Sequence, residues 1–108
     1  MADFTGEEIL AKVAAGESLE GANLMAAELT WANLADAILD RANLTDANLL
    51  QAELSGAQLD TAILDGALLY QASCNSETIW PAGFNWARAI TRWHYWEPPA
   101  TDVYGDDG

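Results

Sequence analysis

The chain has 108 residues, which is the size of one small domain. Its 17 acidic and 4 basic residues give a net charge of −13, which argues against direct binding to nucleic acid or to anionic membrane surfaces. Hydrophobic residues make up 51% of the chain, as in folded proteins, and no apolar run approaches the ~20 residues of a membrane span. The first residues show no secretory signal, so a cytoplasmic location is expected.

Residues 5–15 are predicted to form one short helix. Thr5 and Glu8 have the spacing of a capping box, and Gly16 suits the position that follows a helix C-terminus. An apolar stripe along the helix is formed by Ile9, Leu10 and Val13. A helix this short is marginal alone, so we expect residues 1–16 to cap the open end of the segment that follows.

Residues 17–86 carry fourteen consecutive units of a five-residue repeat, Ala-x-Leu-x-x. The leucines of the repeat are Leu19, Leu24, Leu29, Leu34, Leu39, Leu44, Leu49, Leu54, Leu59, Leu64 and Leu69. Cys74, Ile79 and Phe84 continue the series, and an alanine stands two residues before almost every member. This regularity predicts a single repetitive structure over residues 17–86.

The five-residue period fits a coil of short extended segments and does not fit a helix. In a helix, at ~100° per residue, each step of five would turn about 140° and spread the leucines over every face. In an extended segment, alanine and leucine two positions apart point to the same side. The other two residues are often turn formers, as in Ser55-Gly56 and Asp65-Gly66. Each unit therefore predicts a very short strand and a corner, with alanine and leucine facing one axis.

The run from Ala22-Asn23-Leu24 to Ala72-Ser73-Cys74 resembles the pentapeptide repeat proteins, whose consensus is Ala-(Asp/Asn)-Leu-x-x. The resemblance implies an all-β solenoid, a right-handed quadrilateral β-helix with four units per coil and about 3.5 coils over residues 17–86. The flanking segments, Gly16–Leu19 and Asn75–Phe84, resemble those of short cyanobacterial members.

Two features of the repeat bear on its detailed geometry. The polar middle residue of the consensus is replaced by an apolar one at Ile38, Ile63 and Leu68. With twenty residues per coil, Leu24, Leu44 and Leu64 are expected to form one interior column.

Residues 87–108 are predicted to form an aromatic C-terminal cap. Ala87–Trp93 is expected to make one or two helical turns, and Thr101–Gly108 is expected to be frayed. The rings of this region and of the end of the repeat are Trp80, Phe84, Trp86, Trp93, Tyr95, Trp96 and Tyr104. Either they cover the last coil, or the surplus forms a partner site or a homodimer interface, since tryptophan and tyrosine are enriched in interface cores. The sequence leaves both interpretations open.

Stacking every twenty residues also arranges the outward side chains in columns. Glu20, Asp40 and Asp60 form an acidic column that is expected to continue at Trp80, with Arg41 as the neighbour able to relieve the repulsion. Apolar side chains gather on another face, and the candidate interaction surface comprises Leu50, Leu68, Tyr70, Trp93 and Trp96.

No catalytic constellation stands out, so we expect no enzymatic activity, no cofactor and no metal. The carboxylates occupy solvent-facing repeat positions without a neighbouring nucleophile or base. Cys74 takes a leucine position and is expected to be buried, and His94 lies among the aromatic residues of the cap. One cysteine and one histidine make a zinc site implausible.

The function expected from these features is that of an acidic interaction scaffold with an unidentified protein partner. The family resemblance implies one alternative, a DNA mimic that occupies the DNA site of an enzyme such as gyrase. Residues 17–86 carry ten acidic residues and one basic residue, a net charge of −9. Over the ~17 Å expected from coils ~4.8 Å apart, this is roughly one charge per 2 Å, near the ~1.7 Å of duplex DNA. That length matches only ~5 base pairs, so a mimic would need to be a dimer.

Overall fold

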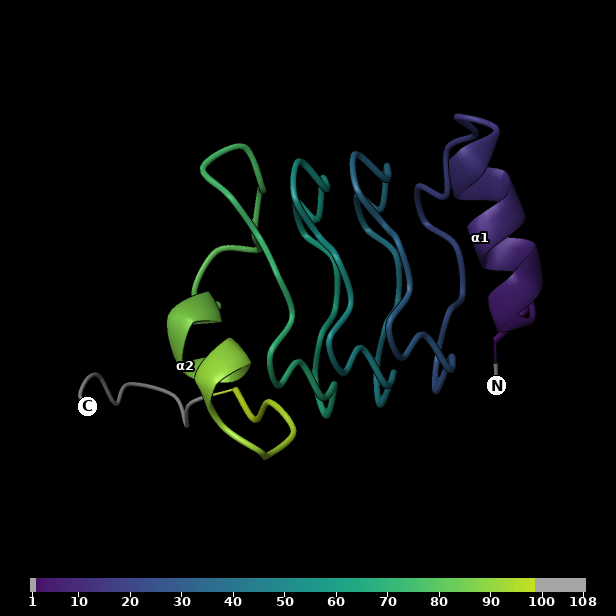
Figure 1. Cartoon of the computed structure of the whole chain (residues 1–108). Coiled ribbons are helices and arrows are strands. Elements are labelled where there is room, and N and C mark those ends of the chain that lie inside the picture. The colour runs from purple at the N-terminus through teal and green to yellow at the C-terminus, as the bar shows by residue number, and fades with distance from the viewer. Residues whose placement is uncertain (1, 99–108) are drawn as a thin grey trace.

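A computed structural model describes residues 2–98, which wind into a solenoid with a helix at each end (Figure 1). Helix α1 comprises Gly6–Ala14 and helix α2 comprises Trp86–Thr91. Between them, the described chain makes isolated parallel bridges and no longer strands. Neither helix is long and apolar enough to cross a membrane. The fraying expected at residues 101–108 and the ring of Tyr104 lie outside the described residues.

A period of twenty residues sets the stacking of the solenoid. The parallel bridges with this spacing are Asn23–Asn43, Glu28–Asn48, Asn33–Glu53, Ile38–Gln58, Asn43–Ile63, Asn48–Leu68 and Glu53–Ser73. Hydrogen bonds run in both directions at each bridge: the Leu24 amide donates to the Asn43 carbonyl (2.8 Å), and the Asn43 amide donates to the Ala22 carbonyl (2.9 Å). Each turn therefore holds four bridged segments, one from each five-residue unit.

Alanine and leucine fill the interior, as the repeat predicts. Leu24, Leu44 and Leu64 are each at most 3% exposed, and the twenty-residue stacking places them in one column. The alanines that stand two residues before the leucines, from Ala27 to Ala72, are also buried. The interior is thus a close-packed apolar core along the whole solenoid axis.

Each corner is a two-residue turn whose second residue has a positive φ. The amide after the turn donates to the carbonyl before it, for example from Ala22 to Leu19 (3.0 Å), which is the pattern of a type II turn. The second corner residues, with φ between 58° and 74°, are Gly21, Ala26, Trp31, Asp36, Arg41, Asp46, Gln51, Gly56, Thr61, Gly66 and Gln71. The solenoid keeps this conformation at eight non-glycine residues because the stacked coils fix every corner.

Asparagine at the middle of a unit completes the corner that follows it. The Oδ1 atoms of Asn23, Asn43 and Asn48 accept a hydrogen bond from the amide two residues later, at 3.1–3.2 Å. Glu53 does the same for the amide of Ser55 (3.1 Å). These bonds satisfy corner amides that the coil itself leaves unpaired, which explains the polar middle residue of the repeat.

The register shifts by one residue at Asn75–Glu77, where the sequence predicted an unbroken series to Trp86. Gln58 bridges to Ile79, twenty-one residues later, and the Gly56 amide donates to the Asn75 side-chain Oδ1 (3.0 Å) instead of to a backbone carbonyl. Ile79 consequently takes a middle position and is 49% exposed. Trp80 takes the inward position and packs against the core, so the expectation that it continues the acidic column was wrong.

Helix α1 confirms the helix predicted near the N-terminus and covers the first coil (Figure 1). Thr5 and Glu8 form both bonds of the capping box, at 3.1 and 2.8 Å. Ile9 is completely buried, and the Asp3 amide donates to the Asn23 carbonyl (2.9 Å), which ties the preceding segment to the same coil.

Replacing Gly6 by alanine is expected to loosen this cap. A Cβ atom at residue 6 would lie 2.6 Å from the backbone oxygen of Glu28, so α1 must move off the first coil. We expect the free energy of unfolding to fall by ~1–3 kcal/mol, although alanine favours an isolated helix over glycine by ~1 kcal/mol. Urea denaturation followed by circular dichroism measures the change, and an increase in stability would show that α1 does not pack this closely.

The C-terminal end is closed by α2 and by the segment after it. Helix α2 begins at its N-cap, Asn85, and buries Ala89. The chain then returns so that Tyr95 forms an antiparallel bridge with Leu68. The Trp96 amide donates to the Ala67 carbonyl (2.6 Å), so residues 95–96 lie along the edge of the last coil.

Candidate functional site

The structure divides the predicted interaction surface into two groups. Leu50, Tyr70 and Trp93 follow one another along one corner of the solenoid. The amide after Leu50, that of Gln51, donates to the Tyr70 carbonyl (2.9 Å), and the Tyr70 and Trp93 rings meet edge to face with centroids 5.3 Å apart. Leu50 and Tyr70 are half-buried, whereas Trp93 is 67% exposed.

Leu68 and Trp96, the other two predicted residues, belong to the cap. Leu68 is bridged by Tyr95, and the half-buried Trp96 ring lies 4.7 Å from the ring of Phe84. Phe84 in turn stacks on Trp80 at 5.0 Å. An open hollow of about 240 Å³ beside Trp96 is lined by several residues of the last coil and the exit segment, among them Ala62, Leu64, Pro81 and Phe84. These rings therefore cover the open end of the core.

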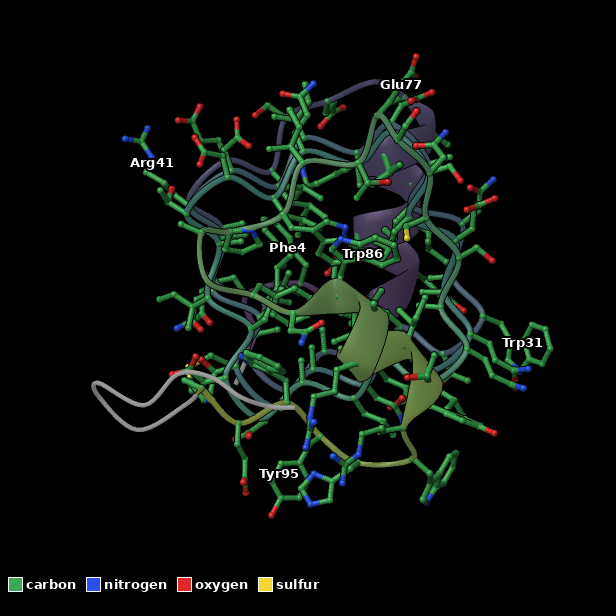
Figure 2. All side chains as sticks on the ribbon, turned by 90° about the vertical axis from the view of Figure 1, so that its left-hand side faces the viewer. Phe4, Trp31, Arg41, Glu77, Trp86 and Tyr95 are labelled. Carbon is green, nitrogen blue, oxygen red and sulfur yellow. The ribbon has the colours of Figure 1, made fainter. Side chains whose placement is uncertain are left out.

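Trp31, which sequence reasoning missed, extends the corner row toward the N-terminus. It occupies the second corner position directly before the row, and its amide donates to the Leu50 carbonyl (2.8 Å). Its side chain is 70% exposed and projects from the corner (Figure 2). The sequence held a signal, because every other second corner residue is glycine, alanine or polar. We call the row of Trp31, Leu50, Tyr70 and Trp93 the aromatic ridge.

A carboxylate stands beside the aromatic ridge. Glu28 and Glu53 belong to the two segments that meet at this corner. The Glu28 Oε2 atom accepts hydrogen bonds from Thr30 Oγ1 (2.8 Å) and Asn48 Nδ2 (3.4 Å), which hold its carboxylate beside the corner. The Glu53 carboxylate is instead held at the following corner, where it accepts from Ser55 Oγ (2.8 Å) and from the Ser55 amide (3.1 Å). The ridge is thus an apolar row with the fixed negative charge of Glu28 beside it.

The predicted acidic column forms at a different corner and is partly compensated. Arg41 pairs with Glu20, as its position in the sequence suggested. Asp40 accepts a hydrogen bond from the Asp60 amide (3.2 Å). Arg41 projects from the side of the solenoid away from Trp31, so the acidic column and the aromatic ridge are separate surfaces (Figure 2). Within residues 2–98, no three histidine, cysteine, aspartate or glutamate side chains are placed so that they could hold a metal ion together.

Cys74 is only partly buried, which corrects the expectation of a fully buried leucine-like position. It lies in the last coil directly before the register shift, where no complete further coil covers it. Burial, and secondarily the charge of Glu53, raise the pKa of its thiol. Both effects disfavour the thiolate, which is the nucleophilic form.

Alkylation of Cys74 is therefore expected to be slow in the folded protein. A raised pKa lowers the thiolate fraction at any pH below it, so iodoacetamide should modify the native chain several-fold more slowly at pH 8 than the chain unfolded in urea. Mass spectrometry of timed samples measures both rates, with a free cysteine peptide in the same urea concentration as the control. Equal rates in the folded and unfolded chains would contradict the raised pKa.

Comparison with known proteins identifies one family. The family model for pentapeptide repeats matches residues 14–40 and 27–66, in eight copies of the repeat. The crystal structure of the pentapeptide repeat protein Rfr23 from the cyanobacterium Cyanothece 51142 is 38% identical, with a TM-score of 0.58 over 59% of this chain and 44% of that one. A pentapeptide repeat protein from Nostoc PCC 7120 is 29% identical, with a TM-score of 0.53 over 80% of this chain and 93% of that one. No curated protein matches the chain.

Proposed function

The chain belongs to the pentapeptide repeat family, and we propose that it is a non-enzymatic scaffold that binds a protein partner through the aromatic ridge. We also assign it the family architecture, a right-handed quadrilateral β-helix. The twenty-residue spacing of the bridges and the four bridged segments per turn support this assignment.

The observation that carries the proposal is the exposure of two tryptophans on one corner. Trp31 and Trp93 are 70% and 67% exposed, and the backbone pairing between coils joins them through Leu50 and Tyr70. Tryptophan and tyrosine lose little side-chain freedom on binding and dominate the energetics of many interfaces. A row of such residues on a rigid solenoid offers a preformed contact surface.

Charge complementarity defines the partner. The chain has a net charge of −13, and the Glu28 carboxylate lies beside the ridge. A partner with apolar side chains surrounded by lysine or arginine would bury the ridge and pair with this carboxylate. An acidic partner would be repelled, so the proposal is limited to a basic protein surface.

Photocrosslinking tests the ridge directly. A photoreactive phenylalanine analogue at residue 31 is expected to capture one basic protein in cells of the source organism, and the same analogue at residue 86 is the matched control. Trp86 is 43% exposed but lies on the end face of the solenoid, away from Trp31 (Figure 2). The double substitution Trp31→Ala and Trp93→Ala should abolish binding of the purified partner, while Trp86→Ala should leave it unchanged. Equal capture at both positions would refute the ridge as the binding surface.

A second copy of this chain is the other occupant to be tested. Trp86, Trp93 and Tyr95 remain 43%, 67% and 51% exposed at the C-terminal end, which supports a homodimer through these rings. Because like net charges oppose association, such a dimer should strengthen as salt screens the repulsion. Sedimentation velocity at low and high salt measures this, and a monomer at tens of micromolar in both would exclude the homodimer.

The acidic surface supports DNA mimicry as a second candidate function. Residues 17–86 carry a net charge of −9, a density close to that of duplex DNA. A mimic should inhibit a DNA-binding enzyme such as gyrase in proportion to its negative charge and independently of the ridge. Inhibition of DNA supercoiling that survives the Trp31→Ala and Trp93→Ala substitutions would therefore favour mimicry over the scaffold.

A further inference from the structure

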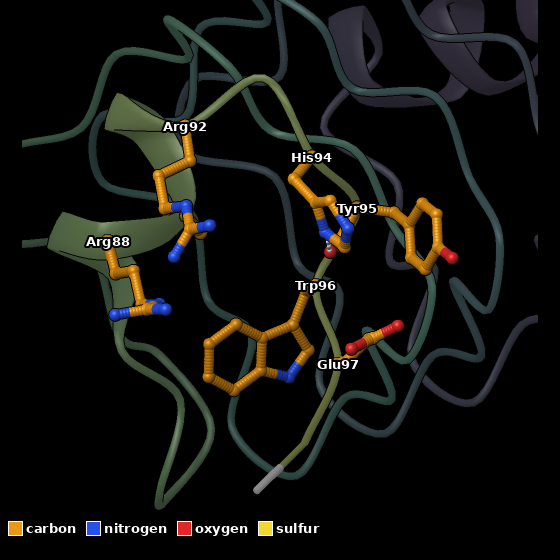
Figure 3. A pocket seen from close by; sticks show the side chains of 7 residues that line it. Arg88, Arg92, His94, Tyr95, Trp96 and Glu97 are labelled. Atoms are coloured by element: carbon orange, nitrogen blue, oxygen red, sulfur yellow. Dashed lines mark hydrogen bonds between the residues drawn. The ribbon is translucent and has the colours of Figure 1, made fainter. Parts of the chain in front are cut away.

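We propose that a hollow beside α2 binds a small oxyanion of the phosphate class through Arg88 and Arg92. The hollow has a volume of about 230 Å³, and the charged and ring-bearing residues that line it are Arg88, Arg92, His94, Tyr95, Trp96 and Glu97 (Figure 3). This inference does not depend on the proposed scaffold function, because it concerns other residues at the end of the solenoid.

Positive charge is concentrated at this hollow in an otherwise acidic chain. Arg88 and Arg92 are two of only four lysine and arginine residues in the sequence. Lys12 and Arg41, the other two, are each paired with a glutamate. Within residues 2–98, neither Arg88 nor Arg92 forms an ion pair, although Glu97 lines the same hollow. Their charges are thus available to an external anion.

The two arginines lie on one side of α2 and its C-cap. Residues four apart face the same side of a helix, so two like charges are held near each other there. Figure 3 shows both guanidinium groups on the side of the hollow, with His94 and Trp96 opposite. An anion placed between the two groups would remove their repulsion and accept several hydrogen bonds from two planar forks.

The wall opposite the arginines is fixed by local contacts. His94 Nδ1 lies 2.7 Å from the carbonyl oxygen of Tyr95, which can only accept, so Nδ1 carries the hydrogen. The His94 ring also stacks on the Tyr95 ring, with centroids 4.5 Å apart. A wall with a fixed shape lowers the ordering cost of binding a small ligand.

Size and charge define the class of ligand. About 230 Å³ is below the ~300–1,000 Å³ typical of sites for larger organic ligands, so the hollow suits one charged group with at most a small substituent. Two guanidinium groups favour a dianion over a monocarboxylate, because each group can pair with part of the doubled negative charge. The Glu97 carboxylate repels either anion. Phosphate and its monoesters combine this charge with the geometry that guanidinium groups bind in a bidentate manner.

Titration with inorganic phosphate tests the site in the full-length protein. Binding is followed by NMR of the arginine Nε–H groups and the Trp96 indole, at ~0.15 M ionic strength, where distant carboxylates are screened. Arg88→Gln and Arg92→Gln should each raise the Kd about tenfold, which corresponds to one lost charge-assisted hydrogen bond. Arg41→Gln is the matched control, since it removes the same charge elsewhere, and it should change the Kd less than about twofold.

Further variants and ligands show which anion is bound and which results would contradict the proposal. Glu97→Gln should lower the Kd about threefold, because it removes the opposing carboxylate. Phenyl phosphate binding tighter than inorganic phosphate would identify an organic monoester as the ligand, whereas equal affinity would identify free phosphate. Acetate binding as tightly as phosphate would overturn the proposal, as would equal losses in the Arg41 and Arg88 variants or no binding at ~50 mM phosphate.

Discussion

Leu44→Ala is expected to lower the free energy of unfolding by about 2–5 kcal/mol. Leu44 is completely buried in the middle of an interior column, between Leu24 and Leu64. Its neighbours cannot move in to fill the cavity, because hydrogen bonds between stacked coils fix the backbone on both sides. Urea denaturation followed by circular dichroism measures the loss.

Leu50→Ala is the matched control for this prediction. It removes the same atoms from a half-buried leucine on the outside of the coil, and it should cost less than ~1 kcal/mol. A loss below ~1 kcal/mol for Leu44→Ala would show that the interior column is not close-packed. The difference between the two losses thus measures how much burial in the interior adds to the cost of removing the same atoms.

Trp96→Ala is expected to have the second largest effect, about 2–4 kcal/mol, and to act locally. The Trp96 ring packs against Phe84 and lines the hollow over Ala62 and Leu64, so its removal exposes the end of the core to water. The bond from the Gly66 amide to the Trp96 carbonyl (2.7 Å) holds the same segment against the last coil. Hydrogen exchange at Gly66 should therefore accelerate, while Leu24 and Leu44 in the earlier coils keep their protection.

Trp93→Ala provides the comparison for Trp96, since Trp93 is 67% exposed and its ring meets that of Tyr70 edge to face. It should cost less than ~1 kcal/mol and leave exchange at Gly66 unchanged. Equal losses for the two tryptophans would contradict the assignment of Trp96 to the cap and of Trp93 to the ridge.

The regular part of the fold was readable from the sequence because each feature of the repeat recurs in successive units. The leucines to Leu69 and the alanines to Ala72 all indicate the same interior, so the prediction does not depend on any single residue. The prediction for the end of the repeat was wrong. Ile79 and Phe84 are apolar and stand at the expected five-residue spacing, although the register of the coil has already shifted before them. The coil contains one extra residue here, and the Asn75 side chain accepts the hydrogen bond that a backbone carbonyl accepts in the other coils. The spacing of residue types in the sequence does not indicate this change of acceptor.

The candidate site was only partly predictable, because its contacts join residues far apart in the chain. Columns twenty residues apart placed Leu50 near Tyr70, but the return of the chain past Leu68 depends on the packing of α2. That return decides which tryptophan is covered and which is exposed. It also creates the hollow at Arg88 and Arg92, which no local sequence motif predicts.

The stacked corners restrict how the length of this protein could change during evolution. Because four units complete one turn, inserting or deleting a single unit between Trp31 and Tyr70 would rotate every later corner to the next side of the solenoid. The aromatic ridge would then be divided between two faces, even though each unit still packed well. Duplication of a whole turn would instead lengthen the aromatic ridge and keep the orientation of α2 relative to the ridge. Selection on a surface that spans several coils should therefore admit length changes of twenty residues and reject those of five.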